Sequence, residues 1–282
     1  AGCASVQPAV PPEAPLALTG TRRFELVSRH TGHTYEVLVS VPLRPPPPQG
    51  YPVVYLLDGN AHFPVAHKIA QAITYYAKGT EVAEPVIVGV GYPGVELLNE
   101  HARAEDYTPP AADLSDTGDA RNPRQGGADR FLTFLDDELW PALASRAPLD
   151  ASRRTIMGHS YGGLLALHAW KTRPGSFSLA VAGSPSIWWN HRSVLEGLAP
   201  RADGPALLIT VGSLEQTPPA RASEDRARML RARQMIDNAQ EAARRSGARL
   251  MLFEGFDHYG SALPMLRLGL LSVMAPSLID AP

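Results

Sequence analysis

The sequence contains almost no cysteine, little lysine and no long apolar run. Among its 282 residues there is a single cysteine, Cys3, so the chain cannot close an internal disulfide or build a cysteine-rich zinc site. No stretch approaches the roughly 18 consecutive apolar residues of a membrane-spanning helix. The formal net charge is only −2, so no overall field attracts nucleic acid or anionic lipid. We therefore expect no transmembrane segment and no nucleic-acid partner.

Lysine is scarce because arginine takes its place. It occurs only at Lys68, Lys78 and Lys171, and the remaining 23 of the 26 basic residues are arginine. A bias in genome composition is one explanation for this excess. The other is that some arginines bind an anionic, planar ligand through their planar guanidinium groups.

The N-terminal segment differs in composition from the rest of the chain. The start Ala1-Gly2-Cys3-Ala4-Ser5 resembles the end of a bacterial lipoprotein signal, in which cleavage falls just before a cysteine that is then lipidated. Proline and alanine dominate the following residues to about Leu18, as in a flexible tether. We expect a flexible tail over residues 1–19, a single catalytic domain over 20–282, and a periplasmic location with a lipid anchor at Cys3. The alternative for Cys3 is an unpaired thiol.

Beyond the tail, short apolar runs of strand length alternate with segments of helical periodicity. This alternation predicts an α/β fold with a mostly parallel central sheet and helices on both faces. The segment 101–127 has no periodicity and is rich in Asp, Pro and Gly, so we expect a long loop there. The expected strands are 22–29, 34–41, 52–57, 85–90, 154–157, 179–182, 206–211 and 249–253, and the expected helices are 129–143, 164–171, 224–245 and 261–274.

The strongest motif is Gly158-His159-Ser160-Tyr161-Gly162, a match to G-x-S-x-G. An apolar run precedes it and a helix-like run follows it, as in the strand–turn–helix of a nucleophile elbow. The sharp turn needs small neighbours, and the two glycines provide them. We therefore predict Ser160 as the catalytic nucleophile.

A serine nucleophile needs a base, and an acid commonly orients that base. In folds that carry such a nucleophile elbow, the catalytic residues follow one another along the chain in the order serine, acid, histidine. His258 follows the last expected strand and is the only histidine after His191, which predicts it as the base. Glu215 is the first carboxylate after the strand 206–211 and is our candidate acid. The alternative is that a backbone carbonyl or a water orients the imidazole.

The oxyanion hole of this fold takes one N–H from the residue after the nucleophile and another from the loop after an early strand. The first is Tyr161. The loop Leu57–Phe63 offers Asn60 through its backbone as the second. Such donors contribute roughly 3–4 kcal/mol each to transition-state stabilisation.

With these pieces placed, the chain from about Arg22 to Met274 resembles the putative-esterase branch of the α/β-hydrolases, and within it the periplasmic trilactone esterases that act on ferric-enterobactin-type siderophores. Four segments carry the resemblance: Tyr55-Leu56-Leu57-Asp58-Gly59-Asn60, Gly158-His159-Ser160-Tyr161-Gly162-Gly163, Ser184-Pro185-Ser186-Ile187-Trp188-Trp189 and Asp257-His258.

The resemblance implies a serine esterase that hydrolyses the ester bonds of a catecholate siderophore, iron-loaded or free, and so promotes iron release. It implies no cofactor and no catalytic metal; any iron belongs to the substrate. In some members of this subgroup the orienting acid is weak or absent. Because a tris-catecholate complex is anionic and planar, the arginines in or beside the long loop and one tryptophan are candidate substrate-binding residues: Arg103, Arg121, Arg124, Arg130 and Trp188.

Other functions fit the same motifs. A general carboxylesterase or thioesterase of the esterase D type would act in the cytoplasm on small acyl or formyl-thiol esters. A siderophore-binding protein would have lost catalysis, and the intact Ser160 and His258 argue against that alternative. An acyltransferase would pass the acyl group of the acyl-enzyme to a sugar hydroxyl instead of to water. A substrate panel separates these alternatives.

Overall fold

The computed structural model describes residues 13–77 and 81–279, so Cys3 and most of the predicted tail lie outside the described residues. Residues 13–18 form neither helix nor strand, and β1 begins at Thr21. In the described part of the chain, no helix combines the length and the apolar character that crossing a membrane requires. The strands are β1 (Thr21–Val27), β2 (Thr34–Ser40), β3 (Tyr51–Leu57), β4 (Val86–Gly91), β5 (Leu149–His159), β6 (Leu179–Gly183), β7 (Ala206–Gly212) and β8 (Arg249–Phe253).

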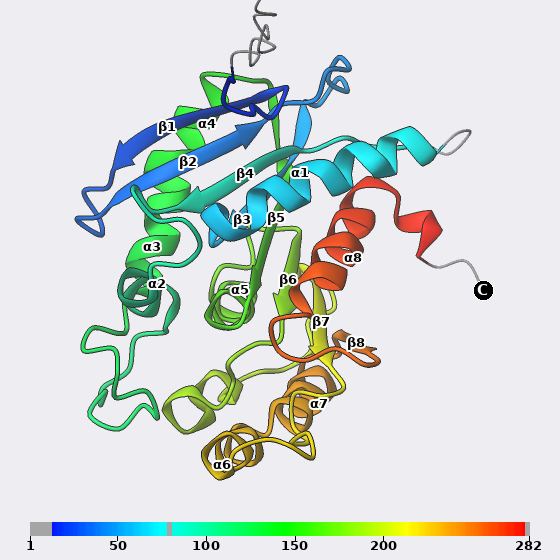
Figure 1. Ribbon diagram of the computed structural model, residues 1–282. Coiled ribbons are helices and arrows are strands. Elements are labelled where there is room, and N and C mark those ends of the chain that lie inside the picture. Colours follow the sequence, from blue (N-terminus) through cyan, green and yellow to red (C-terminus); the bar gives the residue numbers. More distant parts are fainter. Residues whose placement is uncertain (1–12, 78–80, 280–282) are drawn as a thin grey trace, which may run out of the picture.

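The helices alternate with these strands along most of the chain (Figure 1). They are α1 (Gly59–Tyr76), α2 (Glu100–Tyr107), α3 (Ala128–Phe134), the π-helical turn η1 (Leu135–Leu139), α4 (Trp140–Ala144), α5 (Tyr161–Thr172), the 3₁₀ segment η2 (Trp189–Leu195), α6 (Glu224–Arg233), α7 (Met235–Ser246), α8 (Ala262–Met274) and η3 (Pro276–Leu278).

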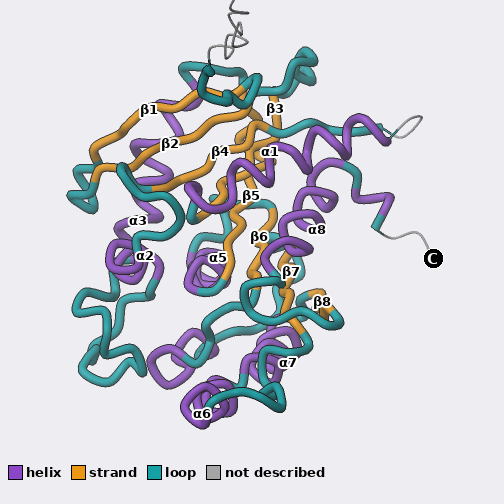
Figure 2. Tube along the Cα trace, viewed as in Figure 1, coloured by secondary structure: helices purple, strands orange, loops and turns teal. Residues whose placement is uncertain are grey.

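The strands form one sheet in the order β1-β2-β4-β3-β5-β6-β7-β8. The pairs β1–β2 and β2–β4 are antiparallel, and every pair from β4 to β8 is parallel. The parallel strands therefore end at one edge of the sheet. Figure 2 shows the loops that follow β5, β6 and β7 gathered at this edge, where ligand sites of open α/β sheets lie.

Side chains of the central strands alternate between two cores, because successive residues of a strand point to opposite faces. In β3, Val53, Tyr55 and Leu57 belong to one buried cluster, whereas Val54 and Leu56 belong to the other. Helices α2, α3, α5 and α7 lie on the first face, and α1 and α8 lie together on the second (Figure 1). The predicted α/β class with helices on both faces is confirmed.

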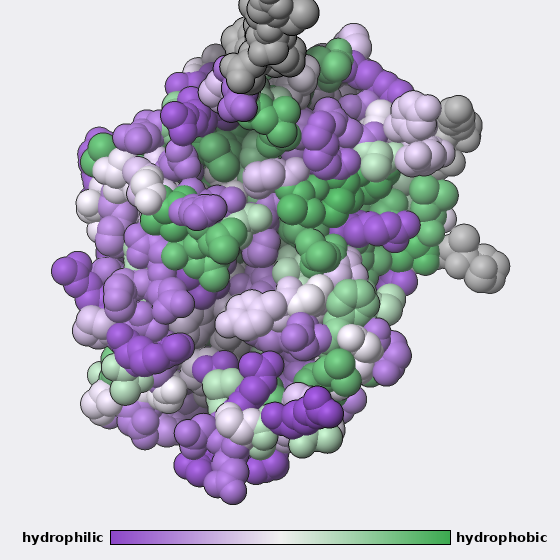
Figure 3. Space-filling model, in the orientation of Figure 1, coloured by the Kyte–Doolittle hydropathy of each residue, from purple (hydrophilic) through white to green (hydrophobic). Residues whose placement is uncertain are grey.

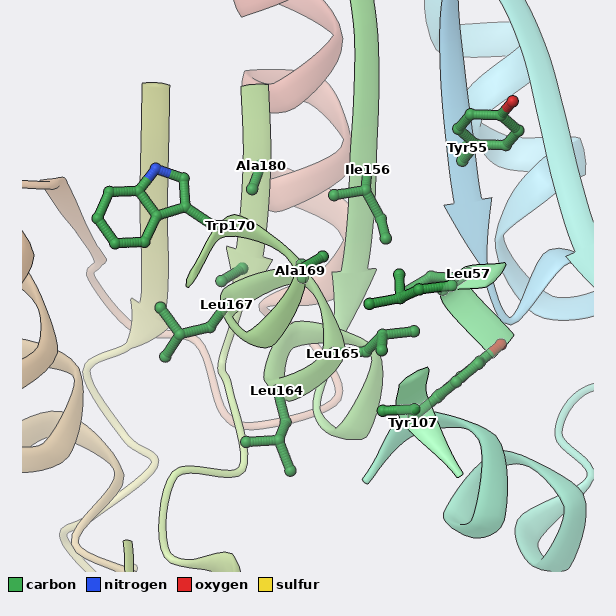
Figure 4. Close-up of a cluster of buried hydrophobic side chains, with 14 of the residues drawn as sticks. Tyr55, Leu57, Tyr107, Ile156, Leu164, Leu165, Leu167, Ala169, Trp170 and Ala180 are labelled. Atoms are coloured by element: carbon green, nitrogen blue, oxygen red, sulfur yellow. The ribbon is translucent and has the colours of Figure 1, made fainter. Parts of the chain in front are cut away.

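Helix α5 is the central support of the site. Its residues Leu164, Leu165 and Leu167 are fully buried. Figure 4 shows Leu165 beside Leu57 of β3, whereas Leu164 points away from the strands on the other side of the helix. On the opposite face, apolar side chains also gather on the outer surface over α1 and α8 (Figure 3). Because α5 is buried almost all round, the turn that precedes it is fixed by packing.

The expected strands agree with the structure to within one or two residues, except that β5 begins earlier, at Leu149. Three expectations about where helices begin or end were wrong. The segment Leu57–Phe63 is not a loop, because α1 begins at Gly59 and continues through Pro64. The segment 101–127 is not loop throughout, since α2 occupies its start. The single helix expected over 224–245 is broken at Gln234, whose φ of 45° ends α6 and starts α7.

Candidate active site

Ser160 occupies the sharp turn between β5 and α5. Its φ of 61° and ψ of −116° lie outside the regions that L-residues favour. The turn is held because the Ser160 N–H donates to the Gly183 carbonyl over 2.9 Å. A Cβ at Gly158 would lie 2.6 Å from the Gly162 carbonyl carbon, so a larger residue there would force the turn open. This strained turn projects the Ser160 hydroxyl from the carboxyl edge of the sheet.

A line of hydrogen bonds runs from Ser160 through His258 to Glu215. The Ser160 Oγ lies 3.1 Å from His258 Nε2, and His258 Nδ1 lies 2.7 Å from Glu215 Oε2. The three side chains come from the β5–α5 turn, the loop after β8 and the loop after β7, so the chain order is serine, acid, histidine. In this arrangement Nε2 can accept the Ser160 proton while Nδ1–H donates to the carboxylate.

Glu215 is 1 % exposed, yet its carboxylate has a donor on each oxygen. Besides His258, its Oε1 accepts from Ser184 Oγ over 2.5 Å and from the Gly212 N–H over 2.7 Å. Burial raises the pKa of Glu215, but the hydrogen bond and charge of His258, with the donors on Oε1, outweigh it and hold that pKa below its ordinary value. The carboxylate therefore stays ionised beside His258.

A second buried group of polar side chains lies behind this line. The Ser184 Oγ contacts the Ser261 Oγ at 2.9 Å, and the Ser261 Oγ lies 3.1 Å from His159 Nε2. Burial lowers the pKa of His159 well below its ordinary value, and the charge of nearby His258 lowers it further. His159 is thus a neutral ring packed 4.7 Å from the His258 ring, centroid to centroid.

The predicted oxyanion donors lie on helix N-termini. Tyr161 is the first residue of α5, where backbone N–H groups have no partner within the helix. Asn60 is the second residue of α1. Its side-chain Nδ2 donates to Glu36 Oε2 over 3.0 Å and to the Tyr92 carbonyl, and its Oδ1 accepts from the Tyr92 N–H. A cavity of about 340 Å³ next to Ser160 is lined by neighbouring residues Asp58 and His62 but not by Asn60.

Arg103 lies on the cavity lining, but a carboxylate already occupies its guanidinium. Its Nε and Nη2 each donate to Asp58 over 2.8 Å, and both side chains are almost fully buried. The guanidinium also lies between the rings of Tyr107 and Tyr161, at 5.6 and 5.5 Å from their centroids. This pair braces the entry to α1 beneath the cavity, because Asp58 is the residue that starts the helix at a φ of 52°.

The other predicted arginines occupy different places. Arg121 is exposed and lines the cavity, 3.5 Å from Asp119. Arg124 and Arg130 are exposed, lie outside the cavity lining and face Glu105, at 3.8 and 3.1 Å.

Trp188 lines the cavity, as do three residues that the sequence did not single out: Arg233, Tyr259 and His62. The Arg233 guanidinium lies over the Trp188 ring, 4.3 Å from its centroid. Ser184 was within reach of sequence reasoning, because it opens the segment Ser184–Trp189 that carries the family resemblance. Arg233 was not, since it is one of many arginines on a helix that reads as a solvated surface.

Among the residues that the structure describes, no group of three or more His, Cys, Asp or Glu side chains could hold a metal ion. A doubly covered, mostly parallel sheet with a serine in a strand–turn–helix elbow, hydrogen-bonded to a histidine and a buried glutamate, defines an ester hydrolase of the α/β-hydrolase type.

Comparison with known proteins identifies the family within this class. Residues 28–260 match the family described as "Putative esterase", and the chain belongs to that family. It is 36 % identical over 259 residues to the ferri-bacillibactin esterase BesA of Bacillus subtilis. The aligned region covers 88 % of this chain and 87 % of that relative. It is 37 % identical over 227 residues to the siderophore triacetylfusarinine C esterase of Aspergillus fumigatus, covering 74 % and 73 %.

The fold agrees with a solved relative. The siderophore hydrolase EstB from Aspergillus nidulans superposes with a TM-score of 0.80 at 29 % identity, covering 96 % of this chain and 100 % of that one. The family that the sequence motifs predicted is therefore confirmed, as is the class of ester hydrolases.

Proposed function

We propose that this chain is a serine esterase that hydrolyses the ester bonds of a catecholate siderophore. The observation that carries the proposal is the hydrogen-bonded line Ser160–His258–Glu215 opening into a cavity with Trp188 on its lining. The names of the relatives support the substrate class, since the bacterial and fungal proteins reported above are named for siderophores.

In the proposed reaction, the Ser160 Oγ attacks the ester carbonyl carbon while His258 Nε2 takes its proton. The oxyanion of the tetrahedral intermediate accepts a hydrogen bond from the Tyr161 N–H, and the Asn60 N–H is the second predicted donor. When the C–O bond breaks, the imidazolium returns the proton to the leaving alkoxide. Water then attacks the acyl-enzyme, with His258 as base, and releases the acid and Ser160.

The test is a substrate panel read by mass spectrometry, comparing iron-loaded and iron-free cyclic tri-catecholate triesters with short-chain 4-nitrophenyl esters. We expect the triester to have the higher kcat/KM. The reverse ranking would favour a general esterase. Ser160→Ala is expected to abolish turnover of every ester while retaining triester binding, and hydrolysis by that variant would refute the serine mechanism.

We also propose that the protein acts in the periplasm and is lipidated at Cys3, which lies outside the described residues. The support is the lipoprotein-like start of the sequence. Fatty-acid labelling of the protein expressed with a lipoprotein signal tests the proposal, with Cys3→Ser as the matched control. Equal labelling of the two proteins would contradict it.

A further inference from the structure

Among the described residues, Arg233 is a half-buried cation on the active-site cavity that forms no ion pair. It is the last residue of α6 and lines the same cavity as Ser160. Its guanidinium carbon lies over the Trp188 ring, 4.3 Å from the centroid, which is within the range of a cation–π contact. Within residues 13–77 and 81–279, its side chain makes no hydrogen bond or ion pair. Arg103, by contrast, has both carboxylate oxygens of Asp58.

Burial of Arg233 disfavours its charge, and the surroundings offset this only in part. Desolvation lowers the pKa of Arg233, and the charge of Arg121 lowers it further. The nearby carboxylate of Asp119 is engaged elsewhere, since its Oδ2 accepts from Tyr161 at 2.6 Å and from Asn122 at 2.6 Å. An anion in the cavity would therefore restore an interaction that the free protein lacks.

The position of Arg233 is fixed from its backbone. The left-handed residue Gln234 ends α6, and the buried Asn238 donates its Nδ2–H to the Arg233 carbonyl over 2.9 Å. At the start of α7, Gln216 Oε1 accepts two backbone N–H groups, at 3.0 Å each. Gln216 directly follows Glu215, so the helix joint that carries Arg233 is bonded to the loop that carries the acid. The backbone that carries the Arg233 side chain is therefore held in place before a ligand binds.

We propose that Arg233, supported by Trp188, binds an anionic, planar group of the ester substrate, such as the paired oxygens of a catecholate, and selects anionic aryl esters over neutral ones. The guanidinium carbon lies over the indole, and its N–H groups make no hydrogen bond within the described residues, so they are available for two parallel hydrogen bonds to such a pair of oxygens. Arg121, exposed on the same lining, adds positive charge. Of the two carboxylates on the lining, Asp58 is paired with Arg103, and Glu100 forms no ion pair within the described residues. This inference rests on the proposed function and specifies which part of the substrate the site recognises.

The test compares Arg233→Gln with Arg231→Gln, an exposed arginine of the same helix that is not on the cavity lining. Three substrates are used: the ferric tri-catecholate triester, a 4-nitrophenyl ester that carries a carboxylate, and neutral 4-nitrophenyl butyrate. We expect Arg233→Gln to raise KM for the two anionic esters by about tenfold or more, as for a lost hydrogen bond to a charged group. The kcat for all three esters and the KM for the neutral ester should change less than about twofold, and Arg231→Gln should behave as wild type.

Arg233→Lys keeps the charge but not the planar fork, so we expect a KM between those of wild type and Arg233→Gln. An unchanged ratio of kcat/KM between anionic and neutral esters in Arg233→Gln would overturn the inference. If wild type cleaves the anionic nitrophenyl ester but not the triester, the proposed function fails while the charge selection by Arg233 is still measured.

Discussion

Replacing Glu215 by glutamine tests the hydrogen-bonded line at its least accessible point. Two donors, the Ser184 hydroxyl and the Gly212 N–H, face Oε1 of the glutamate. They require an acceptor there, so a glutamine at this position would keep its oxygen on that side and turn its NH₂ group toward His258 Nδ1. An amide NH₂ can only donate, and Nδ1 would then have to be the unprotonated nitrogen.

That tautomer places the proton on Nε2, the nitrogen that lies 3.1 Å from Ser160 Oγ. His258 can then no longer accept the Ser160 proton. A wrong tautomer of this kind costs about 10⁴-fold in kcat in a serine protease, which corresponds to about 5.5 kcal/mol in the activation barrier. We expect a loss of about that size for Glu215→Gln with 4-nitrophenyl butyrate, and a nearly unchanged KM, since the side chain is buried away from the substrate.

The matched control is Asp257→Asn. Asp257 precedes His258 in the sequence, but its Oδ1 accepts from the Gly260 N–H over 2.9 Å and not from the imidazole. We expect it to keep kcat within about threefold of wild type, as for a surface hydrogen bond. Circular dichroism and thermal melting would establish that both variants fold. A kcat for Glu215→Gln above one tenth of wild type would refute the reasoning and favour a histidine oriented without an acid.

Three further predictions concern buried polar groups. Ser184→Ala removes one donor from Glu215, and we expect kcat to fall about tenfold with KM unchanged; a rise in KM alone would contradict a positioning role. Asp58→Ala leaves the Arg103 cation buried without its partner, so urea unfolding should show that the free energy of unfolding falls by about 3–5 kcal/mol. A fall of less than about 1 kcal/mol would be inconsistent with a buried ion pair. Burial raises the pKa of Asp106 from 3.8 to about 6, against the opposing charge of His33 and hydrogen bonds from Tyr35 and Tyr92, so the folded state binds this proton more tightly than the unfolded chain. The stabilising effect of the protonated Asp106 is full below about pH 4 and is lost as the pH rises through 6. In urea titrations, the stability of wild type should therefore fall by up to about 3 kcal/mol relative to that of Asp106→Asn between about pH 4 and pH 7. Parallel stabilities of the two proteins across that range would disprove the prediction.

Sequence reasoning succeeded where the signal is local. The apolar run of β3 is continuous because the strand is buried on both faces, and such a run is visible in the residues themselves. The elbow was equally readable, since a Ser160 at positive φ requires small residues at fixed offsets along the chain. The order of strand ends along the chain was then enough to propose His258 and Glu215, which the structure brings into hydrogen-bond contact.

The errors arose where local signals conflict with tertiary packing. Gly59 and Asn60 have the composition of a turn, and Pro64 interrupts the periodicity, yet Asn60 bonds Glu36 and Tyr92 and so ties the first turn of α1 to the sheet. The break at Gln234 is invisible in the helical pattern, because it depends on Gln216 and on the Asn238 side chain, which capture the freed backbone groups.

The sequence could not predict which of its many arginines is available to a ligand. Whether an arginine can meet a ligand depends on which carboxylate reaches it first, and that carboxylate is distant in the chain. Asp58 lies 45 residues before Arg103 and occupies its guanidinium in two hydrogen bonds. The Tyr161 hydroxyl donates to Asp119 from 42 residues away, and Arg233 lies on Trp188 without an ion pair among the described residues. The cation available to an anionic substrate is thus selected by two long-range pairings, and neither pairing has a signature in the residues beside it.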